Sequence, residues 1–395
     1  MISRSFRERY GAVTPETAPQ PPVAMAASSW PLPRGARLIE SPFGDCVVHD
    51  TLYTGDVIRE AFGRLLRAGP PAGGAPLLSD LIFLDTETTG LSGGTGTHVF
   101  LIGVGRFIDD AFHVRQFFMR HPGDEPAVLN ALDASIHATA SLVTYNGRSF
   151  DVPLLETRYR MHGRQFRSHM DHQDLLAPSR AIWKYRLPNC SLGTLERMIL
   201  GVTRELDAPG WMIPQLYFDY LRSREIRTLE PVFEHNRADI VSLARLAGVV
   251  RAFECRAETP EHEIDRLALA LYVQRRYPSD AVIADLRHGW RSPSIPAEMR
   301  FRALRNLSIA LKRGGRYDDA AVEWRAGLDD PSRAVRMYAL EELAKHLEHR
   351  VRDHDAAREL ARLGADGATL ARDAAALQAF ERRLQRLERK LLTRR

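Results

Sequence analysis

The most regular hydrophobic pattern lies between residues 81 and 119. LIFLD (81–85) is a short apolar run bounded by polar residues, which is typical of a buried β-strand. HVFLIGVGRFI (98–108) and AFHVRQFFM (111–119) are rich in β-branched and aromatic residues, and Asp109-Asp110 separates them. Such a pair predicts a β-hairpin, so we expect three antiparallel strands to open the folded domain.

After the hairpin the pattern alternates between helix and strand. A helical period near residues 125–138 is followed by the strand SLVTY (141–145), a helix over about 152–162 and a short strand that ends near Asp174. Antiparallel strands followed by alternating helices and strands predict a mixed α/β sheet flanked by helices.

The chain changes character near residue 255, where Ala, Leu, Arg and Glu at helical spacing replace the strand pattern. YPSDAV (277–282), YDDAAV (317–322) and HDAARE (354–359) each follow one amphipathic helix and open another, at offsets of 40 and 37 residues (317 − 277 and 354 − 317). These offsets are close to the tetratricopeptide length. We predict an all-α, tetratricopeptide-like helical repeat domain, although an irregular helical bundle would produce a similar pattern.

These patterns divide the chain into three regions. Residues 1–36 are rich in Pro and small residues, a composition that buries too little apolar surface to fold, so we predict a disordered leader. Residues 37–255 should form the α/β domain, and residues 256–395 the helical domain with a basic C-terminal tail. A chain of 395 residues is indeed too long for one ordinary core.

Composition narrows the class of protein. With 44% hydrophobic and 27% charged residues the chain has the composition of a soluble globular protein, and no run approaches the ~18 apolar residues of a membrane span. The N-terminus lacks the apolar stretch of a secretory signal and the cysteines fit no metal-ligand spacing, so we expect a cytoplasmic protein with reduced thiols. The net charge of +5 reflects the basic residues 382–395, a segment that suits either weak phosphate binding or a solvated helix end.

Two acids stand at the end of the LIFLD strand. Asp85 and Glu87 are separated by one residue, so both carboxylates point to the same face of a β-strand. Two like charges this close are unfavourable unless a cation neutralises them, and a hard divalent ion with oxygen ligands does so. By itself, an Asp-x-Glu pair also suits two solvated acids on an edge strand.

Two further segments place an acid beside an apolar element. In TYNGRSFDVPLL (144–155) a strand runs into an Asn-Gly turn and Asp151 comes just before a helix, where it suits either an N-cap or a site acid. In EHNRADIVSLARL (234–246) His235 and Asp239 are four residues apart and therefore neighbours on one helical face. A nitrogen base beside a metal-binding acid can activate water, whereas an unrelated surface His–Asp pair would look the same.

Together these segments resemble the DEDD exonucleases of the ribonuclease H-like superfamily. The resemblance is carried by DTETTGL (85–91), NGxxFDxPLL (146–155) and HNxxD (235–239). It extends to the YprB-like family, which includes the bacterial mitomycin repair factor B exonuclease, through LSGGTGTHVFLIGVG (91–105), DLLAPSRAIW (174–183) and RELDAPGWMIPQLYFDYL (204–221). About residues 37–250 are covered, and family members carry tetratricopeptide-like helices after this region. One departure is that His235 lies four residues before Asp239, whereas the best-known His-bearing subgroup has a spacing of five.

This resemblance implies a metal-dependent 3′→5′ exonuclease that acts in DNA repair on DNA with a 3′ end. It implies two divalent ions, Mg²⁺ or Mn²⁺, held by Asp85, Glu87, Asp151 and Asp239, with Asp85 shared between them. His235 would deprotonate the attacking water, and the products would be nucleoside 5′-monophosphates.

Other residues are candidates for substrate binding: Thr88, Gly90, Leu91, Asn146, Arg180 and Lys184. The first three correspond to the segment that contacts the terminal nucleotide in related exonucleases, although an ordinary turn would use the same residues. Arg180 and Lys184 alternate with aromatic residues, a mixture that suits phosphate neutralisation and base stacking on a single strand, or a solvated helix face. Asp174, which follows a strand, is a candidate for an acid that supports the site.

Three alternative functions fit the same sequence. A ribonuclease that trims RNA 3′ ends would use the same carboxylates, because they do not report the sugar. A non-catalytic repair scaffold would act through the helical repeats, which also suit a protein partner such as a helicase, but the complete set of acids disfavours this function. The long basic segments disfavour a small-molecule phosphoesterase, and no membrane partner is expected.

Overall fold

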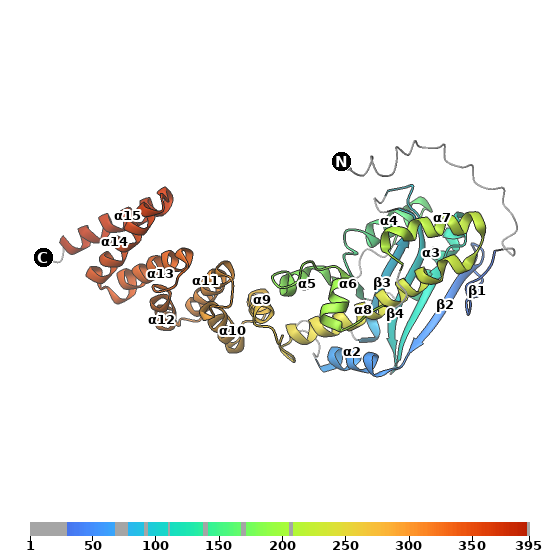
Figure 1. Cartoon of the computed structure of the whole chain (residues 1–395), viewed down its shortest axis with the longest axis horizontal. Coiled ribbons are helices and arrows are strands. Elements are labelled where there is room, and N and C mark those ends of the chain that lie inside the picture. Colours follow the sequence, from blue (N-terminus) through green and yellow to red (C-terminus); the bar gives the residue numbers. More distant parts are fainter. Residues whose placement is uncertain are drawn as a thin grey trace.

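The structure is a computed structural model that describes residues 30–67, 78–90, 94–109, 111–136, 141–166, 171–204 and 208–392. An α/β part and an all-helical part follow one another along the long axis of the molecule (Figure 1). No helix within these residues is both long and apolar enough to cross a membrane.

One mixed sheet of seven strands forms the frame of the α/β part in the described residues. Its strands are β1 (Arg37–Ile39), β2 (Cys46–Tyr53), β3 (Leu81–Thr88), β4 (Val99–Ile108), β5 (Ala111–Phe118), β6 (Ser141–Thr144) and β7 (His172–Asp174). They lie in the order β1-β2-β5-β4-β3-β6-β7. The pairs β3–β6 and β6–β7 are parallel and the others antiparallel, so the predicted mixed sheet is confirmed.

The predicted hairpin is present as β4 and β5, whose pairing runs from Leu101↔Phe118 to Ile108↔Ala111. The prediction of three opening antiparallel strands was wrong, because β1 and β2 precede β3 and extend the sheet beyond β5. Only the first three residues of β2 are fully buried, and the rest alternate between half-buried and exposed. Its apolar signal is therefore too short to stand out in the sequence.

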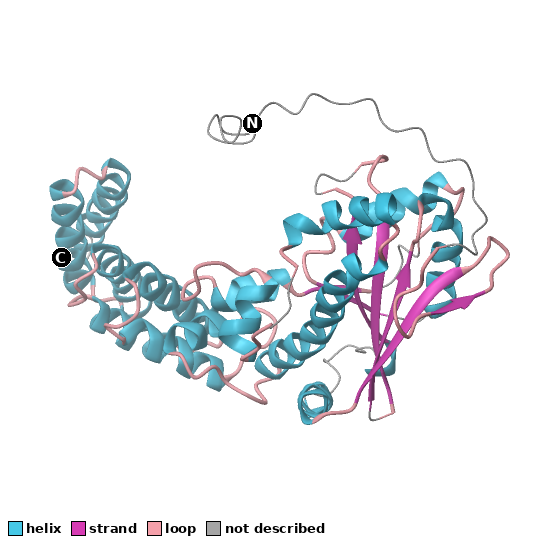
Figure 2. Ribbon diagram, turned by 45° about the vertical axis from the view of Figure 1, so that its right-hand side comes forward, coloured by secondary structure: helices cyan, strands magenta, loops and turns pink. Residues whose placement is uncertain are grey.

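Helices cover both faces of this sheet. On one face lie α2 (Asp56–Arg67), α5 (Leu176–Trp183), α6 (Leu192–Leu195) and the long α8 (Glu230–Glu254), and on the other α3 (Glu125–Ser135), α4 (Asp151–Met161) and α7 (Ile213–Ser223). Figure 2 shows α8 lying against the sheet. Along β3, Leu81 and Phe83 pack on the α8 side, whereas Ile82 and Leu84 pack on the side of α3 and α4. The same alternation assigns Asp85 and Glu87 to the α8 side.

The described fold begins inside the segment predicted to be a leader. Trp30 and Leu32 pack against the core on the α7 side. The ring centroid of Trp30 lies 5.7 Å from that of Tyr220, and the guanidinium of Arg224 lies 4.6 Å from the Trp30 ring. Trp30 supplies the large apolar surface that the surrounding Pro-rich sequence lacks, so residues 30–36 belong to the folded part. The prediction for residues 1–29 lies outside the described residues.

All elements after α8 in the described residues are helical. They are α9 (Glu263–Val273), α10 (Asp280–Arg291), α11 (Ala297–Arg313), α12 (Tyr317–Gly327), α13 (Arg333–His346), α14 (His354–Leu370) and α15 (Ala374–Leu392). The segments YPSDAV, YDDAAV and HDAARE lie at the starts of α10, α12 and α14, and consecutive helices pack against one another. A mixed sheet followed by an all-helical region is thus the confirmed fold class, while the similarity to tetratricopeptide repeats stays a prediction.

One of the hydrophobic clusters of the molecule extends from the α/β part into the helical part. It runs from Phe83 on the sheet through Leu246 of α8 to Leu343 of α13. At the junction α5 packs on α9, and Arg186 donates a hydrogen bond to Asp265 at 2.7 Å. The helical region therefore continues the α/β part directly.

Candidate active site

The carboxyl end of β3 carries the first two candidate acids. Asp85 lies opposite Gly103 of β4, and Glu87 lies opposite Leu101. A register shift between Glu87 and Thr88 ends the regular pairing. Glu87 is only 8% exposed, so this acid is not a solvated edge residue.

Two glycines of β4 allow α8 to lie directly over these acids. A Cβ added to Gly103 would lie 2.4 Å from Oδ1 of Asn236, and one added to Gly105 would lie 2.4 Å from Cγ2 of Ile240. Since no side chain fits at either position, glycine is what permits this close approach of helix to strand. The close approach places the start of α8, with its polar residues, beside the end of β3.

Asn236 is the residue through which α8 holds Asp85. Its Nδ2 donates to Oδ2 of Asp85 at 2.9 Å and to the Asp85 carbonyl at 3.3 Å. Its Oδ1 accepts from Nε2 of Gln116 at 2.9 Å, and both amide side chains are fully buried. The sequence analysis did not assign a role to Asn236, although it stands inside the HNxxD motif three residues before Asp239.

His235 and Asp239 lie side by side on α8, as their spacing predicted. Nε2 of His235 is 3.6 Å from Oδ2 of Asp239. Both meet Arg204, which hydrogen-bonds Asp239 and also Oε1 of Glu196 at 2.5 Å, while its Nη1 lies 3.2 Å from Nδ1 of His235. Burial opposes the charge of Arg204, but the charge of Asp239 and the hydrogen bond to Glu196 outweigh it and raise the pKa of the guanidinium. The sequence analysis missed Arg204, because its role depends on a contact 35 residues along the chain.

Asp151 reaches β3 from the opposite layer. β6 pairs with β3 only as far as Phe83↔Val143, so the edge of β3 is open beyond that point. There the hydroxyl of Thr86 donates to Oδ1 of Asp151 at 2.6 Å. Phe150 and not Asp151 occupies the N-cap position of α4, so the N-cap alternative was wrong.

Asp174 holds the turn that precedes Asp151. Its Oδ1 accepts from the backbone N–H of Asn146 at 2.8 Å, and its Oδ2 accepts from that of Arg148 at 3.1 Å. Asn146 has a left-handed φ of 64°, and a Cβ on Gly147 would lie 2.5 Å from Oγ1 of Thr144. Asp174 therefore holds the backbone of the turn that precedes Asp151, and Asn146 is part of that turn. Substrate binding by Asn146 stays a prediction.

The acids around the end of β3 disfavour the charge of Asp85. Burial, followed by the charges of Asp239, Glu87 and Asp151, raises the pKa of Asp85 well above its usual value, and the hydrogen bond from Asn236 only partly opposes this. Burial raises the pKa of Asp151 to about 6 against the hydrogen bonds from Thr86. Burial also raises the pKa of Asp239, although His235 and Arg204 lower it. Because Asp85 feels the charges of the other three acids, the four belong to one electrostatic cluster centred on Asp85.

The cluster has the type of side chains that bind divalent ions, but these side chains are not arranged as metal ligands in this structure. Among the described residues, no group of three His, Cys, Asp or Glu side chains is arranged to hold a metal ion. Another side chain instead hydrogen-bonds each of three acids: Asn236 with Asp85, Thr86 with Asp151 and Arg204 with Asp239. Buried carboxylates with too little positive charge around them still fit Mg²⁺ or Mn²⁺, which prefer oxygen ligands. The assignment of these acids as metal ligands stays a prediction.

The candidate substrate-binding residues lie on two sides of the cluster. Thr88 donates from its hydroxyl to the carbonyl of Gly90 at 2.8 Å, directly after the β3 acids. Leu91 lies outside the described residues. Arg180 and Lys184 are exposed at the end of α5, which begins two residues after Asp174. Substrate binding by these residues remains a prediction.

Two comparisons with known proteins agree with this arrangement. The RNase_H superfamily profile matches residues 82–251, the span from β3 through most of α8. The chain is also 32% identical over 286 residues to the uncharacterized protein YprB of Bacillus subtilis (strain 168), and the match covers 72% of this chain and 68% of YprB. Membership of this superfamily indicates a nuclease-type hydrolase that binds nucleic acid. The chain belongs to the RNase_H superfamily and, within it, to the family of YprB.

Proposed function

We propose that this protein is a metal-dependent 3′→5′ exonuclease of the DEDD type that hydrolyses DNA during DNA repair. One observation carries the proposal: at a single strand end, burial and the charges of Asp239, Glu87 and Asp151 together raise the pKa of Asp85. Acids arranged in this way are unfavourable for a protein that only has to fold, and favourable for one that binds cations.

Asp85, Glu87, Asp151 and Asp239 would hold two divalent ions, Mg²⁺ or Mn²⁺, with Asp85 shared between them. When bound, such ions ionise a water molecule and stabilise the charge that develops on the phosphate. The attacking water forms a bond to phosphorus while the bond to the 3′ oxygen breaks, so a nucleoside 5′-monophosphate is released. Asn236 and Thr86 orient two of the acids for this role.

His235 is the proposed base that removes a proton from the attacking water. A guanidinium only donates hydrogen bonds, so the contact of Arg204 with Nδ1 uses the lone pair of that nitrogen. Nε2 faces Asp239. His235 can therefore accept a proton only after its contact with Arg204 or with Asp239 is broken. Displacement of Arg204 would also release Asp239 to bind a metal ion.

The test uses the full-length protein with single-stranded DNA, duplex DNA and RNA, each labelled at the 5′ or at the 3′ end, in Mg²⁺, Mn²⁺ or EDTA. We expect metal-dependent shortening of 5′-labelled DNA and immediate release of the 3′ label as a mononucleotide. Asp151→Asn should abolish this activity. Asp219→Asn, at an exposed acid of α7 that pairs with Arg222, serves as the matched control.

Each other outcome has a distinct meaning. Absence of metal-dependent cleavage on every substrate refutes the enzyme. Cleavage of RNA alone overturns the assignment to DNA repair, and release of the 5′ label first overturns the polarity.

A further inference from the structure

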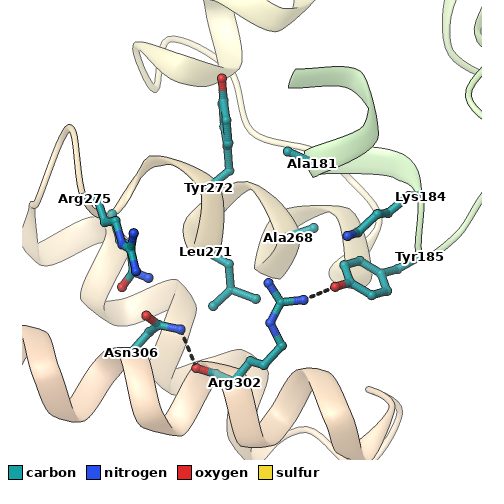
Figure 3. A pocket seen from close by; sticks show the side chains of 10 residues that line it. Ala181, Lys184, Tyr185, Ala268, Leu271, Tyr272, Arg275, Arg302 and Asn306 are labelled. Atoms are coloured by element: carbon teal, nitrogen blue, oxygen red, sulfur yellow. Dashed lines mark hydrogen bonds between the residues drawn. The ribbon is translucent and has the colours of Figure 1, made fainter. Parts of the chain in front are cut away.

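A polar cavity lies at the junction of the two parts of the chain, between α5, α9 and α11 (Figure 3). Its volume is about 400 Å³, which falls within the range of small-ligand sites. The residues that give it its chemistry are Lys184, Tyr185, Tyr272, Arg275, Arg302 and Asn306. We call this cavity the junction pocket.

The junction pocket gathers three positive charges. Lys184, Arg275 and Arg302 line it, and none of its described lining residues is acidic. Among the described contacts these three side chains have no carboxylate partner, whereas the nearby Arg186 and Arg256 are paired with Asp265 and Asp285. Tyr272 donates from its hydroxyl to Glu254, an acid that does not line the cavity, at 3.1 Å. Cations that face one cavity repel one another, so an anion there would be bound favourably.

Aromatic rings lie beside these charges. Nζ of Lys184 is 4.8 Å from the ring centroid of Tyr185, and the guanidinium of Arg302 is 5.7 Å from the same ring and donates to its hydroxyl. Figure 3 shows Lys184, Tyr185 and Arg302 on one side of the cavity and Arg275 on the other. Tyr272 is 37% exposed. Positive charge mixed with accessible aromatic rings is how proteins bind the backbone and bases of a single strand.

Helix α5 connects the junction pocket to the acid cluster. It starts two residues after Asp174, which holds the turn before Asp151, and Lys184 follows its last residue, Trp183. A helix of this length spans about 12 Å. A stacked strand has one phosphate per ~3.4 Å, so three or four phosphates would cover this distance. The exposed Arg180 stands one helical turn before Lys184, along the same route.

We infer that the junction pocket binds the phosphate backbone of a single-stranded nucleic acid, a few nucleotides away from the bond that is cleaved. The inference rests on the proposed function, because it assumes that the 3′ end of the same strand is cleaved at the acid cluster. It gives the helical region a direct role in substrate binding, because Arg275 and Arg302 belong to that region.

The experiment measures binding without cleavage. Full-length protein in EDTA is titrated with fluorescent oligothymidylates of about 4 and about 16 nucleotides, the range of site sizes for single-strand binding proteins. The test variant is Lys184→Gln with Arg275→Gln, and the control is Arg276→Gln, an exposed neighbour that does not line the cavity. Thermal melting checks that each variant is folded, and the two single variants replace the double variant if it is not.

We expect the double variant to bind the long strand about tenfold more weakly, and the short strand and the control variant to show no change. The slope of log affinity against log salt should fall by about 1.4 for the two lost phosphate contacts, at ~0.7 each. Unchanged affinity and slope, or an equal loss on the short strand, overturns the inference. Saturable binding of thymidine monophosphate that the double variant loses, with strand affinity intact, assigns the pocket to a free nucleotide instead.

The same preparations separate this inference from the proposed function. If a short strand is fully cleaved in Mg²⁺ and the pocket variants do not change binding, the inference about the junction pocket is refuted and the proposed exonuclease activity is retained. If no metal supports cleavage but strand binding still depends on Lys184 and Arg275, the proposed exonuclease activity is refuted and the inference about the junction pocket is retained.

Discussion

Glu348 in the helical region and Asp85 in the α/β part are both buried acids with opposite surroundings. Glu348 is 1% exposed and accepts hydrogen bonds from Arg383, Arg386 and Lys390. Burial opposes its charge, but the hydrogen bonds from Arg386 and Lys390 outweigh burial and lower its pKa to about 2. Around Asp85 the charged neighbours are acids, and its pKa is raised well above the usual value.

The difference shows which acids serve the fold. Where an acid has a structural role, this chain supplies the cations that a buried carboxylate needs. Among the described residues at the end of β3 it supplies the amide of Asn236, the hydroxyl of Thr86 and the side chains of Arg204 and His235, and the pKa of Asp85 is still raised. The proposed divalent ions would supply the missing positive charge, so we expect substitutions in the two regions to have opposite consequences.

The largest expected effect comes from a crossed pair of variants, Asp85→Asn and Glu348→Gln. Asp85→Asn should lower kcat/KM on single-stranded DNA by about 10³-fold or more, because metal ions contribute several kcal/mol to phosphoryl transfer, and should leave stability unchanged or raised. Glu348→Gln should retain activity and lose about 2 kcal/mol of unfolding free energy in chemical denaturation, since three cations lose their partner. Loss of activity in Glu348→Gln, or unfolding of Asp85→Asn, would contradict the division between the regions.

Gly103→Ala should have the next largest effect, on activity without removing any acid. Its Cβ would displace Asn236 and thereby move Asp85 relative to α8. Misplacement of a catalytic group by about 1 Å reduces rates by up to about 10²-fold. Gly96→Ala is the control, since a Cβ there meets nothing within 4 Å. Equal kcat values in the two variants would show that Asn236 does not position Asp85.

Arg204→Gln tests whether the one arginine of the cluster competes with the metal. Removing its charge from Asp239 should lower the Mg²⁺ concentration for half-maximal activity by about fivefold or more. Two unit charges about 4 Å apart interact by ~1 kcal/mol even in bulk water, and this pair is largely buried. Arg222→Gln, whose partner is the exposed Asp219, should leave this concentration unchanged. A higher Mg²⁺ requirement in Arg204→Gln would mean that Arg204 supports the loaded site.

The smallest expected effect is a pH dependence of stability with opposite sign in the two regions. The pKa of Asp151 is raised from 3.8 to about 6, so its stabilising contribution is present below pH 3.8 and is lost as the pH rises through 6. We therefore expect the unfolding free energy of Asp151→Asn, measured by denaturation in EDTA, to rise relative to that of the unsubstituted protein by on the order of 1 kcal/mol between pH 4 and pH 7. For Glu348, whose pKa is lowered from 4.5 to about 2, stability is present above pH 4.5 and is lost towards pH 2. A gain in Asp151→Asn that does not vary with pH would exclude ionisation of Asp151 as its cause.

Much of this fold could be predicted from local sequence pattern. β3, the β4–β5 hairpin, α3, β6, α4 and β7 lie close to their expected positions, since each has its own period or its own turn. β2 was missed because its burial depends on pairing with β5, about 60 to 70 residues away, and β1 because it is a mostly exposed strand of three residues that pairs with β2. Trp30 was likewise assigned to the leader because its partner, Tyr220, is distant in the chain.

The candidate acids could be named from the sequence: the backbone period pairs Asp85 with Glu87 and His235 with Asp239, and the resemblance to the DEDD exonucleases adds Asp151. Their surroundings could not. Asn236 reaches Asp85 across 151 residues, through a gap that exists only because position 103 has no side chain. The contact of Arg204 with Asp239 and the lining of the junction pocket likewise depend on segments that are separate in sequence. The chain thus encodes locally which groups are present and which face each occupies, whereas packing decides which charges remain without a partner, because that depends on distances between residues far apart in sequence.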